Sequence, residues 1–227
     1  MSDPAFVPHA DRFDPGLPPE RAAREFHDAL RRRRSVRMFS DRPVSLETVE
    51  WIVRAAASAP SGANKQPWRF VCVRDPALKR EIRLAVEREE REFYDRRASA
   101  EWKADLAPLG TDADKAYLET APWLVVVFRL TRTDGGGRVY YPDESVGIAV
   151  GFLLAAAHFA GLATLTHTPA PMRFLERLLR RPGHERAWML IPIGHPADDC
   201  VVPAHALGRR PLDETMVLDR PEPRVGR

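Results

Sequence analysis

The feature that most constrains the fold is a run without a single charged side chain, residues 146–165. Such a run is buried either as a membrane-spanning helix, whose length it matches, or inside a globular core. It is rich in Ala and Gly and contains His158 and Gly161, which favours a buried helix followed by a turn and a strand. We therefore expect a core helix at 142–160 and a short strand at 163–166, with a membrane span as the alternative.

The composition agrees with a globular core. The chain has 227 residues, of which 44% are hydrophobic and 30% charged, enough for one large α+β domain or two small ones. The net charge of +3 is too small to indicate nucleic-acid binding. Cys72 and Cys200 are too few for a disulfide framework or a cysteine metal site. Residues 1–19 lack the apolar segment of a signal peptide, so we expect a cytoplasmic protein with no membrane partner.

Local patterns predict helices and strands interspersed along the chain. Ser45, and Asp75 followed by Pro76, are typical of helix starts. We expect helices at 21–34, 46–58, 76–97, 142–160 and 172–181, and strands at 69–74, 123–130, 163–166 and 187–194. No glycine-rich dinucleotide fingerprint or Walker loop is present, which argues against the common nucleotide-binding folds.

Three segments carry residue types suited to binding a ligand. In the first, Arg33, Arg34 and Arg37 surround Ser35, and guanidinium groups bind phosphate through paired hydrogen bonds. The second, residues 59–68, is a Ser-, Gly- and Asn-containing loop, and the third is Thr-His-Thr-Pro at 166–169. Taken singly, these segments are also explained by a solvated basic face, a turn and a cap.

In this order and spacing, the three segments resemble the nitroreductase superfamily. A closer resemblance, to its iodotyrosine deiodinase subfamily, is carried by Glu90, Tyr94, the stretch 105–112, Lys115 and the segment 209–213. It covers residues 31–217 and is of the soluble microbial type. The fold that it implies is α+β, with a central, mostly antiparallel sheet flanked by helices in an intertwined homodimer.

The resemblance implies FMN as the cofactor and no metal. Thr168 is the implied catalytic residue, with its hydroxyl near N5 of the flavin. The implied cofactor-binding residues are Arg33, Arg34, Ser35, Arg37, Pro60, Ser61, Gly62, Thr166, His167, Thr168 and Arg209.

The implied reaction is reductive dehalogenation of halogenated tyrosines, iodotyrosine giving tyrosine and iodide, with reduced flavin as the electron source. Glu90, Tyr94 and Lys115 would hold the substrate zwitterion, and the Ala63 amide would face the phenolate. Glu90 and Tyr94 lie four residues apart and so share a helix face, although an ordinary charged face explains them equally well. The alternatives are a general FMN-dependent NAD(P)H nitroreductase or quinone reductase, and a non-catalytic flavin-binding or basic interaction protein.

The same resemblance divides the chain. Residues 1–19 would form a flexible arm and 20–217 a single FMN-binding domain, in which 98–121 is an active-site lid. The extended segment 195–217 would wrap the partner subunit, and 218–227 would be a flexible tail. The active site would lie at the subunit interface, and the electron donor stays open between NAD(P)H and a reductase.

Overall fold

A four-stranded antiparallel sheet forms the centre of the molecule, in the order β1-β2-β4-β3. The computed structural model describes residues 5–219. The strands are β1 (Trp68–Val73), β2 (Trp123–Leu130), β3 (Ala163–Thr164) and β4 (Glu185–Gly194). The α+β fold with an antiparallel sheet flanked by helices is therefore confirmed.

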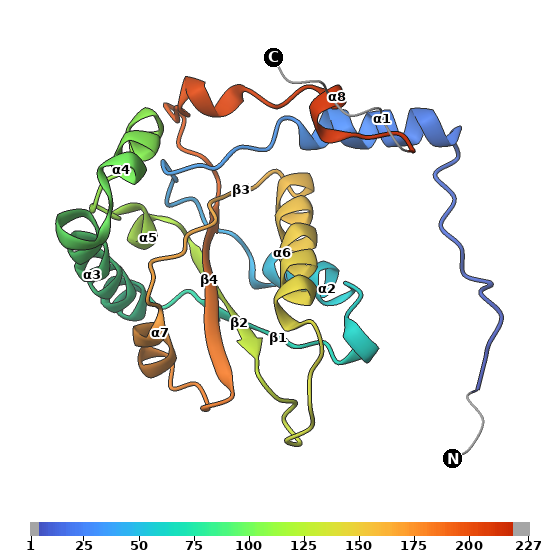
Figure 1. Ribbon diagram of the computed structural model, residues 1–227, viewed down its shortest axis with the longest axis horizontal. Coiled ribbons are helices and arrows are strands. Elements are labelled where there is room, and N and C mark those ends of the chain that lie inside the picture. The colour runs from blue at the N-terminus through green and yellow to red at the C-terminus, as the bar shows by residue number, and fades with distance from the viewer. Residues whose placement is uncertain (1–4, 220–227) are drawn as a thin grey trace.

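Alternate side chains of β2 fill two separate cores, because successive residues of a strand point to opposite faces. Trp123, Val125 and Val127 pack with α2 (Leu46–Ala57) and α6 (Pro142–Phe159) on one face. Leu124 and Val126 pack on the other face with α3 (Pro76–Glu92), α5 (Tyr117–Thr120) and α7 (Arg173–Leu178). Figure 1 shows the result, a sheet between two layers of helices.

The charge-free run is the helix α6 followed by a turn and β3, as expected. Val146, Ala149 and Leu153 are buried against the sheet, whereas Phe152 and Phe159 on another face are exposed. No helix within residues 5–219 is long and apolar enough to cross a membrane. The membrane-span alternative is therefore not supported.

Both predicted helix caps are present. The Thr48 amide donates to Ser45 Oγ at 3.1 Å, and the Leu78 amide donates to Asp75 Oδ1 at 2.8 Å. α3 continues directly into a π-helical turn at Phe93–Arg97, so the predicted helix 76–97 is confirmed in extent.

Two predicted helices are shorter than expected. α1 (Pro19–Leu30) ends four residues before the expected 34, since the chain turns at Arg31 and then extends to pair Val36 with Thr164. α7 likewise ends at Leu178 rather than 181.

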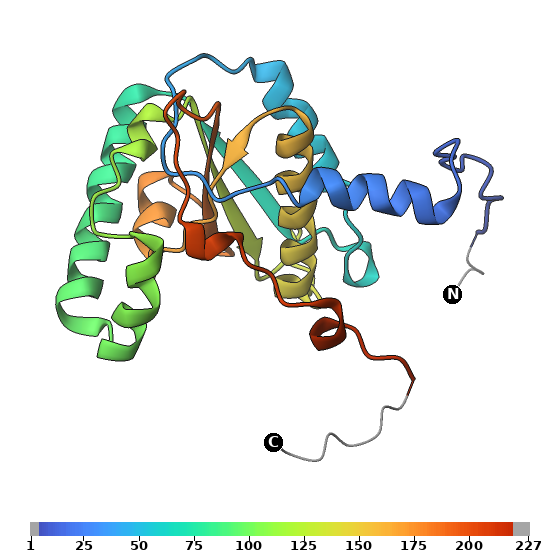
Figure 2. The ribbon, with the colours of Figure 1, turned by 90° about the horizontal axis from the view of Figure 1, so that it is seen from above.

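Both ends of the chain lie away from the sheet. At the N-terminal end, residues 5–18 contain no helix or strand, and α1 has no buried residue. At the other end, the C-terminal segment extends past α1 and contains one short helix, α8 (Leu212–Thr215) (Figure 2). This shape fits the predicted arm and wrapping segment. Residues 1–4 of the arm and 220–227 of the predicted tail lie outside the described residues, and the flexibility of both ends stays a prediction.

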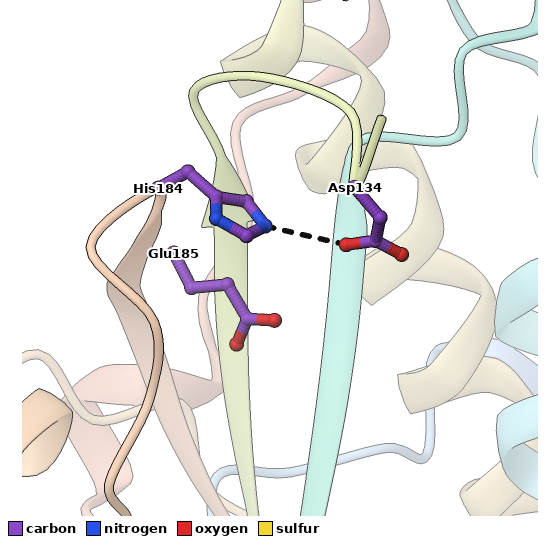
Figure 3. Close-up of side chains that lie close together, drawn as sticks. All are labelled: Asp134, His184 and Glu185. Carbon is purple, nitrogen blue, oxygen red and sulfur yellow. Dashed lines mark hydrogen bonds and ion pairs between the residues drawn. The ribbon is translucent and has the colours of Figure 1, made fainter. Parts of the chain in front are cut away.

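A polar cluster fastens the sheet at the start of β4 (Figure 3). Asp134, His184 and Glu185 come together there, and their residue types are those of a metal site. However, Arg69 donates to both carboxylates and Arg181 donates to Glu185 at 2.6 and 2.9 Å. These arginines already neutralise the acids, so the cluster acts as an ion-pair network that joins β1, β4 and the turn after β2.

The two acids of this cluster should contribute unequally to stability. Glu185 is 1% exposed, so Glu185→Ala leaves two guanidinium groups without their buried partner and should cost about 2 kcal/mol of unfolding free energy. Asp134 is exposed and its ion pairs are screened by solvent, so Asp134→Ala should cost clearly less than Glu185→Ala. Urea unfolding of both variants measures the difference, and equal losses would contradict this account.

Candidate active site

A cavity of about 400 Å³ lies between the end of α3, residues 102–117 and the chain at 165–170. Most of the residues singled out from the sequence for flavin ring and substrate contacts line it. They are Glu90, Tyr94, Lys115, Thr166, His167 and Thr168, and Arg37 of the predicted phosphate-binding set lines the same cavity. Residues far apart in the chain therefore converge on one space, large enough for a planar ring and a small substrate.

A second cavity, of about 240 Å³, is lined by Arg33, Arg34, Ser35, Arg37 and Arg209. Arg37 lines both cavities, so the basic cavity adjoins the larger one. Arg209 comes from the C-terminal segment, which returns to the other arginines just after a short helix at Ala204–Leu207. The sequence-predicted phosphate set is thus brought together in space.

Backbone pairing holds these two groups of residues side by side. The Val36 amide donates to the Thr164 carbonyl at 3.1 Å, which makes the arginine segment a neighbour of β3. His167 and Leu190 exchange two backbone hydrogen bonds, of 2.9 and 2.8 Å, which fixes the Thr-His-Thr segment against β4. The sheet therefore sets the relative position of both cavities.

The basic cavity suits an anion. Burial lowers the pKa of Arg33, and the neighbouring charges of Arg209 and Arg34 lower it further. Within residues 5–219, Arg33, Arg34 and Arg37 form no ion pair with a carboxylate. Like charges held together without a counter-charge favour a bound phosphate, which guanidinium groups bind through paired hydrogen bonds.

The larger cavity contains a buried ion pair. Lys115 Nζ lies 3.4 Å from Glu90 Oε2, and both side chains are nearly buried. Tyr94 donates to Thr111 Oγ1 at 2.9 Å, and its ring lies 6.0 Å from Lys115 Nζ. Burial raises the pKa of Glu90, and the Lys115 ammonium opposes that rise. Glu90, Lys115 and Tyr94 thus present a carboxylate, an ammonium and a phenol within reach of one small molecule.

His167 is a neutral neighbour of this pair. Its Nε2 lies 3.6 Å from Glu90 Oε1 but has no hydrogen-bond partner among residues 5–219. Burial, together with the neighbouring charges of Lys115 and Arg37, lowers the pKa of His167 to about 3. A neutral imidazole forms no ion pair with Glu90, so Lys115 is the charged partner of that carboxylate in the cavity.

Comparison with known proteins identifies the family. The family model described as "Nitroreductase family" matches residues 30–195, most of the chain.

The chain belongs to the nitroreductase family.

Within that family the chain belongs with the iodotyrosine deiodinases. It is 52% identical over 205 residues to the iodotyrosine deiodinase of Haliscomenobacter hydrossis, a match that covers 88% of this chain and 92% of that one. The human iodotyrosine deiodinase 1 is 41% identical over 218 residues, covering 93% of this chain and 74% of its own. A crystal structure of oxidized iodotyrosine deiodinase bound to FMN and 3-iodo-L-tyrosine matches with a TM-score of 0.70 and 35% identity, covering 76% of this chain and 90% of that chain.

One predicted group of this nitroreductase-family chain is not brought to the cavities. Pro60, Ser61, Gly62 and Ala63 line neither of them. The loop is nevertheless firmly shaped, because Ser61 Oγ accepts from the Gln66 amide at 2.9 Å. A Cβ at Gly62 would lie 2.7 Å from the Tyr140 carbonyl oxygen, so no larger residue fits there without a shift.

The same loop holds strained backbone. Ala63, Asn64 and Gln66 have φ angles of 49°, 50° and 47°, in the left-handed region that non-glycine residues rarely adopt. Such strain is concentrated at functional sites in proteins. The strain therefore marks this loop as a candidate functional segment, although the loop lines neither cavity of its own chain.

Several cavity residues were not predicted individually. Trp102, Thr111 and Tyr117 line the larger cavity from the lid segment. Arg97 donates to the Ala170 carbonyl at 2.9 Å and so ties the π-helical turn to the segment after Thr168. Their aromatic side chains within residues 98–121 were the available signal for Trp102 and Tyr117, whereas nothing local marked Arg97.

The buried neutral His167 should make stability depend on pH. The unfolded chain binds a proton there near pH 6.5, but the folded chain does so only near pH 3, so the contribution is complete above pH 6.5 and lost as the pH falls between these values. Below pH 6, wild type should lose about 1 kcal/mol of unfolding free energy per pH unit more than His167→Gln. Urea unfolding from pH 7 to 4 measures both slopes, and parallel curves would show that His167 is protonated in the folded protein.

Proposed function

We propose that this chain is an FMN-dependent oxidoreductase that removes the halogen from halogenated tyrosines, converting iodotyrosine to tyrosine and iodide. The observation that carries the proposal is the set Glu90, Tyr94 and Lys115 in a cavity that adjoins a basic one. Its similarity to iodotyrosine deiodinases supports the same conclusion.

The residues present fit FMN. Arg33, Arg34 and Arg209, with the Ser35 hydroxyl, would hold its phosphate in the basic cavity, where these guanidinium groups gather with no carboxylate partner within residues 5–219. Arg37, at the junction of the two cavities, would neutralise the phosphate from the side of the ring. The isoalloxazine would lie along Thr166, His167 and Thr168, with the Thr168 hydroxyl donating to its N5.

The charged pair of the larger cavity fits an amino-acid zwitterion. Glu90 would receive the α-ammonium, and Lys115 and the Tyr94 hydroxyl would receive the α-carboxylate. A zwitterion brings one charge of each sign, so Glu90 and Lys115 both remain paired when it binds. A ligand with a single charge would leave one of them buried and unpaired, which is costly.

Bound and reduced, FMN supplies the two electrons that, with one proton, replace the carbon–iodine bond by carbon–hydrogen as iodide leaves. The chain contributes position and a dry cavity. Trp102 and Leu106 line the cavity from the lid segment, where they would cover the substrate ring and exclude water. The electron donor, NAD(P)H or a reductase, stays open.

The reaction is tested with FMN-loaded protein, dithionite as reductant and iodotyrosine, by measuring iodide release. We expect turnover in wild type. Lys115→Ala should raise the KM for iodotyrosine at least about tenfold, because the buried carboxylate loses its cationic partner, while FMN stays bound. Bound flavin absorbance during iodotyrosine titration reports binding separately from turnover.

The control is a nitroaromatic substrate that has no zwitterion. Its reduction should be nearly unaffected by Lys115→Ala. If wild type reduces the nitroaromatic but neither binds nor dehalogenates iodotyrosine, the chain is a general nitroreductase. If Lys115→Ala releases FMN instead, the role given to Lys115 is wrong.

We also propose that two copies form a homodimer whose active sites lie at the interface. Three observations support it: α1 has no buried residue, Phe152 and Phe159 of α6 are exposed, and the shaped loop at 60–63 reaches neither cavity of its own chain. In a dimer the partner would cover the apolar residues and receive the loop. Ser61 and Gly62 would then contact the partner's flavin, and the Ala63 amide would donate to the substrate phenolate.

A cytoplasmic location agrees with the two unpaired cysteines.

Co-expression of two impaired variants tests the shared site. Gly62→Ala should displace the loop and abolish its contribution to the site, since the new Cβ meets the Tyr140 carbonyl. Lys115→Ala weakens substrate binding in the cavity. If each site takes its cavity from one chain and its loop from the other, co-expression of both variants gives hybrid dimers with one intact site. Random pairing then restores about a quarter of wild-type activity.

Sedimentation of wild type should show the dimer. Each variant alone should stay at low activity at a subsaturating iodotyrosine concentration. Co-expression that gives no more activity than the two variants measured separately would mean that loop and cavity belong to the same chain.

A further inference from the structure

One stripe of α3 is polar yet faces the chain around α5. Lys79, Arg83 and Glu87 are four residues apart and therefore lie above one another on the helix. Lys79 Nζ donates to the carbonyl oxygens of Glu119 and Ala121 at 2.8 and 2.7 Å. Arg83 lies within ion-pair distance of Glu119, at 3.3 Å, and of Glu87, at 3.1 Å. Successive turns of α3 thus fasten the segment that follows Lys115.

Glu87 makes the last of these contacts. Its side chain is buried, with 6% of the residue exposed, and its Oε1 accepts a hydrogen bond of 3.1 Å from the Lys115 backbone amide. Arg83 neutralises the carboxylate, and Arg91 lies 3.9 Å from its other oxygen. The buried Glu87 carboxylate therefore holds the backbone amide of Lys115 by a hydrogen bond, and the Lys115 side chain lines the cavity.

The two ends of Lys115 are held by the same helix. Its backbone amide is on Glu87 and its ammonium is 3.4 Å from Glu90. These two glutamates are three residues apart, about 4.5 Å along the helix axis. Lys115 itself is 4% exposed, and its ammonium also donates to the Asp112 carbonyl, so both ends of the residue are held in buried surroundings.

We propose that Glu87 is the positioning residue that sets Lys115 for the substrate carboxylate, a proposal that rests on the function proposed above. Glu87 does not line the cavity and so acts only through Lys115. It follows that Lys115 belongs to the fixed body of the protein. The moving part of the predicted lid then ends before Lys115, rather than extending to residue 121.

Three variants separate positioning from general stabilisation. Glu87→Ala removes the acceptor, whereas Glu87→Gln keeps an oxygen for the Lys115 amide but loses the charge. Glu119→Gln is the matched control, because Glu119 pairs with Arg83 in the same network but its side chain makes no contact with Lys115 in the described residues. Each FMN-loaded variant is assayed for KM and kcat with iodotyrosine and for urea unfolding.

Glu87→Ala should raise the KM about tenfold, with kcat changed less than about threefold and FMN affinity unchanged. Glu87→Gln should keep the KM within about threefold of wild type while losing stability, as Glu119→Gln does. If the KM follows stability across all three variants, or stays unchanged in Glu87→Ala, Glu87 is merely structural and the proposal is overturned.

Hydrogen exchange of the Lys115 amide gives a readout that does not depend on turnover. Glu87→Ala should speed this exchange about tenfold or more, and Glu87→Gln and Glu119→Gln should change it much less. Unchanged exchange in Glu87→Ala overturns the proposal even if wild type proves inactive on iodotyrosine. Faster exchange in an inactive wild-type background would instead show that Glu87 holds Lys115 and that the proposed function is wrong.

Discussion

Burial of β2 on both faces is the constraint on which the rest of the structure depends. Its odd-numbered side chains belong to the core under α2 and α6, and its even-numbered ones to the core under α3 and α7. The helix that carries Glu90 is therefore fixed to one face of the sheet. The backbone that carries the arginines is paired to the β3 edge of the same sheet. One rigid strand arrangement thus sets the distance between the two halves of the site.

Elements whose signal is local could be predicted from the sequence. Ser45 and Asp75 cap helices because their side chains reach amides three residues on, and the apolar run 123–130 forms β2 with the predicted bounds. The first helix was predicted too long because its end is decided elsewhere. Arg31–Arg34 are compatible with a helix, but pairing of Val36 with Thr164, far along the chain, pulls the segment straight. No pattern within residues 31–36 indicates that Thr164 is the pairing partner.

The candidate site shows the same division. Helical spacing places Glu90 and Tyr94 on one face, but it cannot distinguish a binding face from a solvated one. Lys115 and Arg209 join their sets only through the fold, and it was the family resemblance, rather than spacing, that pointed to them. His167 was expected to line the flavin ring, and its position 3.6 Å from Glu90 was not foreseen. That contact joins His167, whose backbone pairs with β4, to Glu90 on α3. The periodicity of residues within one segment cannot predict a contact between two segments.

The position of Arg37 on both cavities has a thermodynamic consequence. Its single positive charge contributes to the electrostatic potential in each space, so an anion bound in one cavity lowers the potential felt by a ligand in the other. The two binding free energies are therefore coupled, and the coupling is reciprocal. An affinity measured for one ligand alone differs from its affinity in the ternary complex, and the two cavities behave as a single linked site.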